Sequence, residues 1–371
     1  MKYYLIAGEA SGDLHASNLM LALKKVDSNA EFRFWGGDLM QEVGGTMVKH
    51  HRDLAFMGFI EVIANLRTIL KNIKICKKDI QEYNPDVLIF IDYPGFNLRI
   101  AKWAKKEGIP THYYISPQIW AWKENRIEAI KRDVDKMYVI LPFEKKFYED
   151  KHAYPVHFVG HPLLDAIAKK DLVAPHEFRK KHKLDNRPII ALLPGSRNQE
   201  ISKMLEIMLS ITDDFKEYQF IIAGAPSQDP EFYKQFIKKK NVYLVMNNTY
   251  DVLSLSTAAL VTSGTATLET ALFKVPEVVC YKGSTISYEI AKRIVDLDYI
   301  SLVNLIMDRE VVKELIQKEF NKKNLITELK KILETDHRKT IFEDYFELER
   351  ALGGNGASMK TAELIYQFTK N

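Results

Sequence analysis

The stretch KYYLIAGEASGDLHASNLMLALKK, residues 2–25, joins an apolar run to a helix-like stretch through a short polar turn. Residues 3–7 are continuously apolar, as in a buried strand, and residues 14–25 are typical of a helix. The turn between them holds two glycines, Gly8 and Gly12, together with Glu9 and Asp13. The same strand-to-helix alternation recurs along the chain, which predicts an α/β fold.

The predicted strands and helices divide the chain into two halves. VLIFI at 87–91 is wholly apolar, as expected of a parallel strand covered on both faces. Other strands are expected at 31–35, 111–115, 136–141, 156–159, 189–193, 220–223, 242–245, 259–262 and 277–281. A charged stretch around residues 165–187, with Pro175 inside it and Pro188 directly after it, predicts a linker with a short helix. A helical tail is expected from about residue 311, broken at 352–358. We therefore predict doubly wound domains over 1–165 and 186–340, followed by C-terminal helices over 341–371 that cross back to the first domain.

Composition narrows the class of protein. At about 150 residues per domain, 371 residues predict two domains. The formal net charge of +4 is too small for a dedicated nucleic-acid binder, but it suits an anionic substrate or membrane surface. Cys76 and Cys280 lack a CxxC neighbour and are expected to be reduced and buried. Without a signal peptide or an apolar run of about 18 residues, the sequence predicts a cytoplasmic protein.

Two strand-to-helix turns in the second half predict a nucleotide diphosphate site. Ligands of parallel sheets bind beyond the carboxyl ends of the strands. There SGTATLE, 263–269, offers the free N–H groups of a helix start to an anion and Glu269 to the hydroxyls of a ribose. PGSR, 194–197, adds an arginine that can neutralise a diphosphate. The candidate donor-binding residues are Gly195, Ser196, Arg197, Gly224, Ser263, Gly264, Thr265, Ala266, Thr267 and Glu269. Helix capping in the first turn and an ordinary tight turn in the second are the structural alternatives.

Acidic residues dominate the corresponding turns of the first half. The opening turn matches neither GxGxxG nor GxxxxGK[ST], and its carboxylates would repel a phosphate. We expect Glu9, Asp13 and Asp92 to contact neutral sugar hydroxyls or to act as a base. The alternatives are that Asp13 or Glu9 caps the helix and that Asp92 forms a turn with Pro94 and Gly95. The two D-x-D triplets, 133–135 and 296–298, do not follow strands, so no metal site is expected.

An apolar segment precedes a lysine-rich helix at residues 54–78. An interfacial membrane contact or an acyl-chain groove would use such a segment, and a core helix with a solvated basic face is the alternative. The candidate contact residues are Phe56, Met57, Phe59, Ile60 and Ile63, with Ser11 from the opening turn.

Taken together, these motifs closely resemble the lipid-A-disaccharide synthase family. The matches are collinear over nearly the whole chain, and GEASGD with SPQIWAW is highly specific, whereas SGTATLE alone indicates only a wider set of nucleotide-sugar enzymes. The matching stretches are AGEASGDLH (7–15), GGDLM (36–40), MGFIEV (57–62), IDYPGFNLRIA (91–101), YYISPQIWAWKENRI (113–127), LPFEKKFYE (141–149), FVGHPLLD (158–165), LLPGSRNQEI (192–201), TSGTATLETAL (262–272) and LGGNGAS (352–358).

The resemblance implies a GT-B glycosyltransferase, with two Rossmann-like domains facing across a cleft and no cofactor or metal. It implies inverting transfer from UDP-2,3-diacylglucosamine to the 6-hydroxyl of 2,3-diacylglucosamine 1-phosphate, called lipid X, giving a β-1,6-linked disaccharide and UDP. It also implies a cytoplasmic protein that is peripheral on the anionic inner membrane. Whether the protein is a homodimer stays open.

Residue roles follow from the same resemblance. Arg197 and the backbone of 264–267 would hold the diphosphate, and Asn304 would orient the donor sugar. Glu9, Asp13 and Asp92 would line the acceptor cleft, with Asp92 favoured as the base and Glu9 second. The chain departs from the family at Val303, where proline is usual, and at Gly95, where many members have a second aspartate.

Two rival functions remain at this point. One is another GT-B enzyme, either a UDP-N-acetylglucosamine 2-epimerase or a lipid-linked transferase of cell-wall synthesis. The apolar segment argues against an epimerase, which needs no acyl groove. The other is a non-catalytic UDP-sugar-binding protein, against which the retention of Glu9, Asp92, Arg197 and Glu269 argues.

Overall fold

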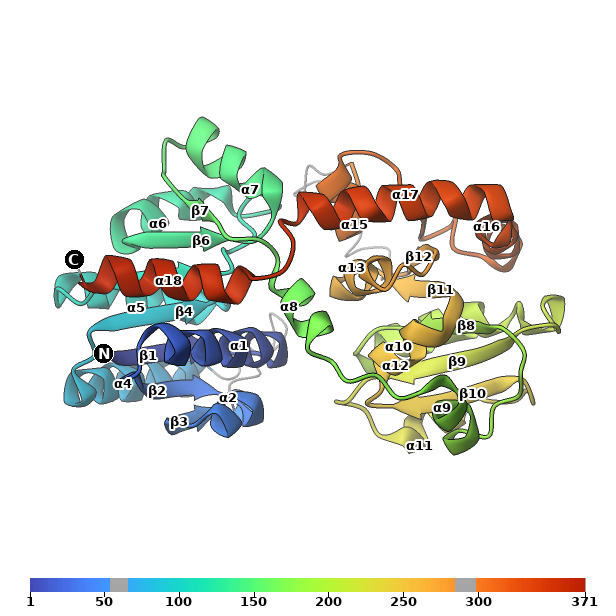
Figure 1. Cartoon of the computed structure of the whole chain (residues 1–371), viewed down its shortest axis with the longest axis horizontal. Coiled ribbons are helices and arrows are strands. Elements are labelled where there is room, and N and C mark those ends of the chain that lie inside the picture. Colours follow the sequence, from blue (N-terminus) through green and yellow to red (C-terminus); the bar gives the residue numbers. More distant parts are fainter. Residues whose placement is uncertain (54–65, 284–297, 371) are drawn as a thin grey trace. The chain divides into compact units, whose positions relative to one another are not determined.

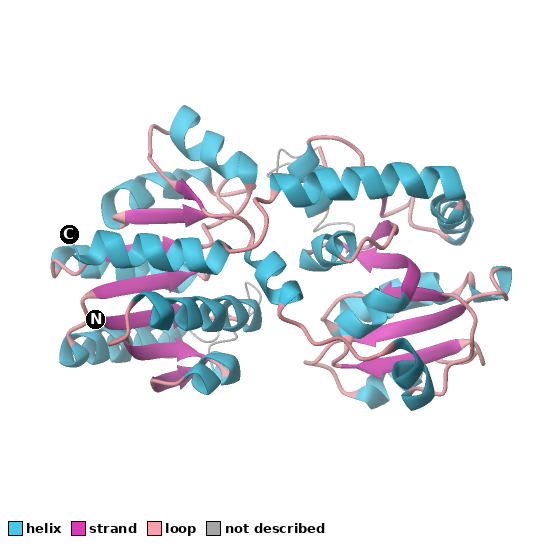
Figure 2. Ribbon diagram, in the orientation of Figure 1, coloured by secondary structure: helices cyan, strands magenta, loops and turns pink. Residues whose placement is uncertain are grey.

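The computed structural model describes residues 1–53, 66–283 and 298–370, and Figure 1 traces the chain through it. The chain divides into two compact units, Met1–Lys169 with Leu352–Asn371 and Lys170–Ala351. In each unit a parallel sheet is packed between helices (Figure 2). The predicted α/β class, with two doubly wound sheets, is confirmed.

The first unit contains seven strands among the described residues, in the order β3-β2-β1-β4-β5-β6-β7. The strands are β1 (Lys2–Ala7), β2 (Glu31–Gly36), β3 (Thr46–His50), β4 (Val87–Ile91), β5 (Thr111–Tyr114), β6 (Lys136–Val139) and β7 (His157–Phe158). The helices are α1 (Ala10–Val26), α2 (Asp38–Val43), α4 (Leu66–Tyr83), α5 (Pro94–Lys106), α6 (Ile127–Asp133), α7 (Pro142–Lys146), α8 (Pro162–Ala168) and α18 (Ala357–Lys370), with short turns η1 (His51–Asp53), η2 (Glu124–Arg126) and η3 (Phe147–Lys151).

The second unit contains six strands among the described residues, in the order β10-β9-β8-β11-β12-β13. The strands are β8 (Ile189–Leu193), β9 (Gln219–Gly224), β10 (Val242–Met246), β11 (Ser256–Thr262), β12 (Glu277–Tyr281) and β13 (Lys313–Ile316). The helices are α9 (Pro175–Lys181), α10 (Asn198–Leu209), α11 (Pro230–Lys234), α12 (Thr249–Leu255), α13 (Thr265–Leu272), α15 (Leu302–Met307), α16 (Lys322–Leu333) and α17 (Thr335–Ala351), with the short turn η4 (Thr212–Asp214).

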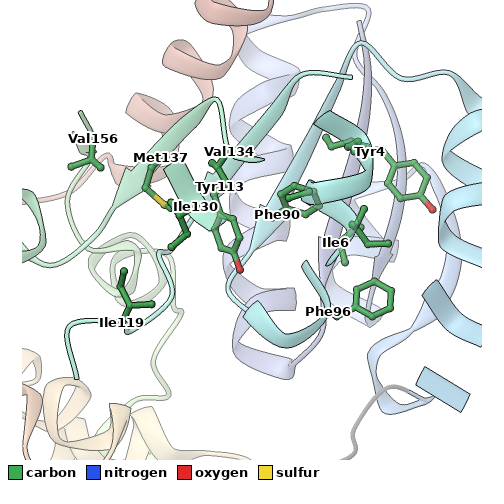
Figure 3. Packing of buried hydrophobic residues seen from close by; sticks show 14 of the residues in the cluster. Tyr4, Ile6, Phe90, Phe96, Tyr113, Ile119, Ile130, Val134, Met137 and Val156 are labelled. Carbon is green, nitrogen blue, oxygen red and sulfur yellow. The ribbon is translucent and has the colours of Figure 1, made fainter. Parts of the chain in front are cut away.

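The core of the first unit explains why its central strands are apolar throughout. Every residue of β4 is buried, because helices cover both faces of the sheet (Figure 1). Side chains from β1, β4 and β5 pack with those of α4, α5 and α6, and Figure 3 shows Ile6, Phe90 and Tyr113 in this cluster. The rings of Phe90 and Tyr113 have centroids 5.7 Å apart. This packing fixes the strand ends from which the candidate acids project.

The last two long helices belong to different units. Helix α17 lies in the second unit, whereas α18 lies in the first, where it contacts α1. Two contacts tie the start of α18 to the first unit. The N–H of His161 donates to the carbonyl of Leu352 at 2.9 Å. The buried carboxylate of Asp165 accepts from the N–H groups of Gly356 and Ser358 at 2.6 and 2.8 Å, so the matching stretches FVGHPLLD and LGGNGAS contact each other.

Several sequence-based expectations differ from the structure in detail. Residues 313–316 form strand β13 instead of part of a helical tail, because their pairing with β12 overrides the local pattern. Strand β3 was not expected. Strand β5 stops at Tyr114, because Ile115 has a φ of 65° that no strand accommodates. Helix α1 begins at Ala10, four residues before the expected Leu14.

The apolar residues Phe56, Met57, Phe59, Ile60 and Ile63 lie outside the described residues. Helix α4, which follows them, is described. Among the described helices, none has the length and apolar content needed to cross a bilayer. Both cysteines, Cys76 and Cys280, are buried and unpaired.

Candidate active site

A pocket of about 430 Å³ lies in the second unit, where β8, β9 and β11 end. Its position agrees with the rule that ligands bind beyond the carboxyl ends of parallel strands. Seven of its lining residues come from the two predicted turns, and Glu269 comes from the helix that follows the second. The lining comprises Leu193, Gly195, Ser196, Arg197, Glu200, Ala223, Ala225, Pro226, Thr249, Thr262, Ser263, Gly264, Thr265, Ala266 and Glu269.

The PGSR turn is held in a conformation that requires glycine. Gly195 has a φ of 101°, and a side chain there would collide with the carboxylate of Glu200. That carboxylate accepts from the N–H of Ser196 at 3.2 Å, while Gln228 donates to the Ser196 carbonyl at 2.7 Å. The turn therefore places Arg197, the N-cap residue of α10, at the pocket with an exposed side chain.

The second turn places a helix N-terminus at the same pocket. Gly264, the N-cap residue of α13, has a φ of 153°, and a side chain added there would meet only open space. The hydroxyl of Thr267 donates to the Gly264 carbonyl at 2.9 Å, so this buried threonine stabilises the helix start instead of lining the pocket. The first N–H groups of a helix have no intrahelical partner, and they suit an anion.

Glu269 is supported by a residue that the sequence did not single out. The hydroxyl of Tyr250, on α12, donates to the Glu269 carboxylate at 2.8 Å. Burial raises the pKa of Glu269, and the hydrogen bond from Tyr250 opposes this shift. Tyr250 lies just beyond the carboxyl end of β10, in the sequence NNTYD. This position after a predicted strand is the sequence feature that could have identified it as a site residue.

Two other predicted donor residues do not line the pocket. Gly224 ends β9, where a side chain would collide with Met246. Asn304 is fully buried, and its amide nitrogen donates to the Val312 carbonyl and to Glu314 at 2.8 and 3.0 Å. The amide oxygen of Asn304 accepts from the N–H groups of Val311 and Val312. These four hydrogen bonds occupy both polar atoms of the Asn304 side chain with partners inside the second unit.

Asp92, in the first unit, follows β4 in a strained turn. Asp92 and Tyr93 have φ values of 43° and 50°, a region that costs energy for residues other than glycine. The carbonyl of Asp92 accepts from the side-chain amide of Asn97 at 2.7 Å and from the hydroxyl of Tyr113 at 2.5 Å. Burial, and secondly the negative charge of Glu9, raise the pKa of Asp92 to about 6.

The glycines of the opening turn make room for this arrangement. A side chain on Gly8 would collide with the ring of Tyr93, so only glycine lets the two turns pack together. A side chain on Gly12 would press on Ala7 at 3.3 Å and approach Ile91 at 3.8 Å. The two glycines thus bring the turn after β1 against the turn after β4.

The acids of the opening turn have different surroundings. The buried carboxylate of Asp13 accepts from the N–H groups of Gly37, Leu39 and Met40 at 2.8, 3.1 and 3.1 Å, so it supports the start of α2 and does not cap its own helix. Glu9 is the N-cap residue of α1, but its side chain makes no capping hydrogen bond. Glu9 and Ser11 are both exposed.

The segment after β5 depends on a buried acid that the sequence did not identify. The carboxylate of Glu144, at the start of α7, accepts from the hydroxyl of Ser116 at 2.6 Å and from the indole N–H of Trp120 at 3.2 Å. It also accepts from the N–H groups of Ile140 and Leu141 at 3.1 and 2.9 Å. The LPFE stretch therefore holds the SPQIW stretch.

Comparison with known proteins shows which family the chain resembles in sequence. Residues 3–368 match the family model described as lipid-A-disaccharide synthetase. A lipid-A-disaccharide synthase of Syntrophus aciditrophicus is 39% identical, covering 99% of this chain and 97% of its own. One from Coxiella burnetii is 37% identical, covering 98% and 97%.

One solved protein is similar to this chain in fold only. The UDP-GlcNAc 2-epimerase of Neisseria meningitidis, solved bound to UDP-GlcNAc, has a TM-score of 0.68 over the whole of both chains at 14% identity. The shared architecture confirms the predicted GT-B fold, and the full-length sequence matches separate this chain from the epimerases. The chain belongs to the lipid-A-disaccharide synthase family, a family of glycosyltransferases that use UDP-sugars.

Proposed function

We propose that the chain transfers 2,3-diacylglucosamine from UDP-2,3-diacylglucosamine to the 6-hydroxyl of 2,3-diacylglucosamine 1-phosphate. The observation that carries this proposal is the strained Asp92, whose pKa of about 6 suits a base at neutral pH. A pocket with a helix N-terminus and an arginine, in the other unit of the same chain, suits the nucleotide. We propose that the first unit receives the acceptor and the second the donor.

The donor's UDP group would occupy the pocket of the second unit. Arg197 and the N–H groups at the start of α13 suit the diphosphate, because each supplies positive charge or free donors. The carboxylate of Glu269, oriented by Tyr250, suits the two hydroxyls of the ribose. The side-chain bonds of Asn304 favour a structural role for that residue, so the proposal assigns it no contact with the donor sugar.

The chemical step would be one in-line displacement. The oxygen of the acceptor's 6-hydroxyl forms a bond to the anomeric carbon while the bond from that carbon to the β-phosphate oxygen breaks. UDP leaves with the electron pair, and the hydroxyl proton passes to the carboxylate of Asp92. One displacement inverts the anomeric centre and gives the β-1,6 linkage. The bonds that Asp13 accepts from three N–H groups leave Glu9 as the second candidate for the base.

The lipid substrates suggest a peripheral membrane contact through α4. Its apolar Leu70 and Ile75 are 55% and 38% exposed, although such side chains are usually buried. They share the helix with several exposed lysines, a composition suited to an anionic surface. We propose this helix, on the cytoplasmic face of the inner membrane, as the membrane-facing surface of the first unit.

Turnover by the purified full chain tests the function. The two lipid substrates would be supplied in detergent with EDTA, and UDP and disaccharide would be followed by mass spectrometry. We expect both products in equal amounts. UDP without disaccharide would contradict transfer to this acceptor, and tight UDP binding without either product would favour a non-catalytic UDP-sugar-binding protein.

A further inference from the structure

The segment after β5 presents an exposed tryptophan with two cations near its ring. Trp122 is 46% exposed. The ammonium group of Lys123 lies 4.2 Å from the centre of the Trp122 ring, and the guanidinium carbon of Arg126 lies 5.6 Å from it. Both distances are within the range of cation–π attraction. The ring therefore gathers two positive charges on one small surface, called here the Trp122 surface (Trp122, Lys123 and Arg126).

Among the described residues, no acid forms an ion pair with the cations of this surface. Glu124, the acid between the two cations, is 2.7 Å from Lys151 and 2.9 Å from His152. Across residues 1–53, 66–283 and 298–370, no carboxylate forms an ion pair with Lys123 or Arg126. Two cations against one exposed ring, with no acidic partner among the described residues, favour an anionic ligand at this surface.

The segment that carries the surface starts at the sheet edge where Asp92 lies. Strand β5 neighbours β4, and the segment that follows β5 leads to Trp122. The Tyr113 hydroxyl donates to the Asp92 carbonyl, and the positive charge of Arg126 is close enough to Tyr113 to act against the rise in that group's pKa. Arg126 therefore lies near Tyr113, the residue whose hydroxyl binds the Asp92 carbonyl.

The backbone of this segment is strained at both ends. Ile115 and Lys123 have φ values of 65° and 57°, which neither a β-branched residue nor a lysine ordinarily adopts. Between them, Glu144 fixes Ser116 and Trp120. Strain of this kind persists only where the surroundings impose it, and it is concentrated at functional sites.

We propose that Lys123 and Arg126 bind the 1-phosphate of the acceptor lipid, with Trp122 in contact with its hydrocarbon portion. The inference rests on the proposed function, which supplies an acceptor that combines a phosphate with acyl chains. An arginine and a lysine provide charge-assisted donors for the phosphate oxygens. The phosphate of the acceptor, and not that of a membrane phospholipid, is favoured because Arg126 lies near Tyr113, which binds the Asp92 carbonyl.

Binding of two acceptors that differ only in the phosphate tests the site. Isothermal titration of the full chain in detergent would compare 2,3-diacylglucosamine 1-phosphate with the same lipid lacking its phosphate. We expect Lys123→Gln and Arg126→Gln each to weaken binding of the phosphorylated lipid about tenfold and to leave the other lipid unaffected. Lys131→Gln removes an exposed cation of α6, outside the Trp122 surface, and should change neither.

The outcomes separate this site from the proposed reaction and from a membrane anchor. Equal weakening for both lipids, or no weakening, would overturn the phosphate site. The two variants could also fail to sediment with phosphatidylglycerol vesicles while still preferring the phosphorylated lipid. That result would overturn the phosphate site in favour of a membrane anchor. Selective binding of the phosphorylated lipid through these residues, in a wild-type chain that makes no disaccharide, would support the site while contradicting the proposed function.

Discussion

The side-chain amide of Asn97 donates to the backbone carbonyl of Asp92 at 2.7 Å, which fixes the turn that carries the candidate base. Asn97 lies in the first turns of α5 and is fully buried. The hydroxyl of Tyr113 binds the same carbonyl from β5. Asp92 is thus held in a left-handed conformation by two neighbours that need not touch a substrate.

Removing either neighbour should impair catalysis without removing the acid. For Asn97→Ala and Tyr113→Phe we expect kcat to fall about tenfold, the equivalent of one net hydrogen bond of about 1.4 kcal/mol, with little change in the KM of the donor. Steady-state kinetics would measure both values. Changes confined to the donor's KM would contradict a role in positioning Asp92.

Replacing the acid itself should separate activity from stability. Asp92→Asn should lower kcat by a factor of about 10²–10⁴, the usual contribution of a general base. Because the pKa of Asp92 is raised to about 6, its ionised form destabilises the fold above that pH. The neutral amide removes this cost, so at pH 8 the free energy of unfolding should rise by up to about 2 kcal/mol. Urea unfolding would measure it, and unchanged turnover would remove Asp92 as the base.

The pH profile should report the same group. The base acts when ionised, so kcat/KM should fall about tenfold per unit as the pH drops below about 6. Glu9→Gln removes the negative charge that contributes to the raised pKa of Asp92, so the acid limb should move to lower pH. A profile measured from pH 4.5 to 8.5 would detect this. If Glu9 were the base instead, this variant would abolish turnover at every pH.

The proposed binding of UDP in the pocket of the second unit can be tested through Tyr250. Tyr250→Phe removes the hydroxyl that donates to Glu269 and leaves the ring packed on Phe273, whose centroid is 5.1 Å away. We expect UDP to bind about tenfold more weakly, because the carboxylate loses its orientation and one charge-assisted bond. Calorimetric titration with UDP would measure the change. Tyr243→Phe, on β10, is a matched control that should bind UDP normally.

Replacing Glu144 should lower the stability of the fold more than it lowers activity. Glu144→Gln keeps one oxygen but replaces the other with a donor facing groups that themselves donate, so we expect a loss of about 2–3 kcal/mol in the free energy of unfolding. The fluorescence of Trp120, which donates to Glu144, should shift towards longer wavelength. A variant with the stability and spectrum of the wild type would show that Glu144 does not hold the segment after β5.

The two stretches predicted to bind the donor are local in sequence, and the structure brings both to one pocket. PGSR and SGTATLE each contain their own strand end, glycine and helix start, so their placement at one sheet edge follows from parallel topology. Sequence analysis did not identify Tyr250 and Glu144, because their hydrogen-bond partners lie 19 and 28 residues away in the chain. The bonds of Asp13 to the N–H groups of Gly37, Leu39 and Met40 could not be inferred from its own helix either.

The sequence by itself determined the alternation of strands and helices, the two parallel sheets and the family, because apolar patterning and collinear motifs are encoded along the chain. Tertiary structure alone decided the surroundings of each acid. The carboxylate of Asp13 accepts hydrogen bonds from the start of α2, whereas Asp92 lies in a turn of two left-handed residues where burial raises its pKa. It also decided that residues 313–316 form a strand, since pairing with β12 outweighs the local helical pattern. The physical reason is that hydrogen-bond partners and burial, which set both conformation and pKa, are supplied by segments distant in sequence.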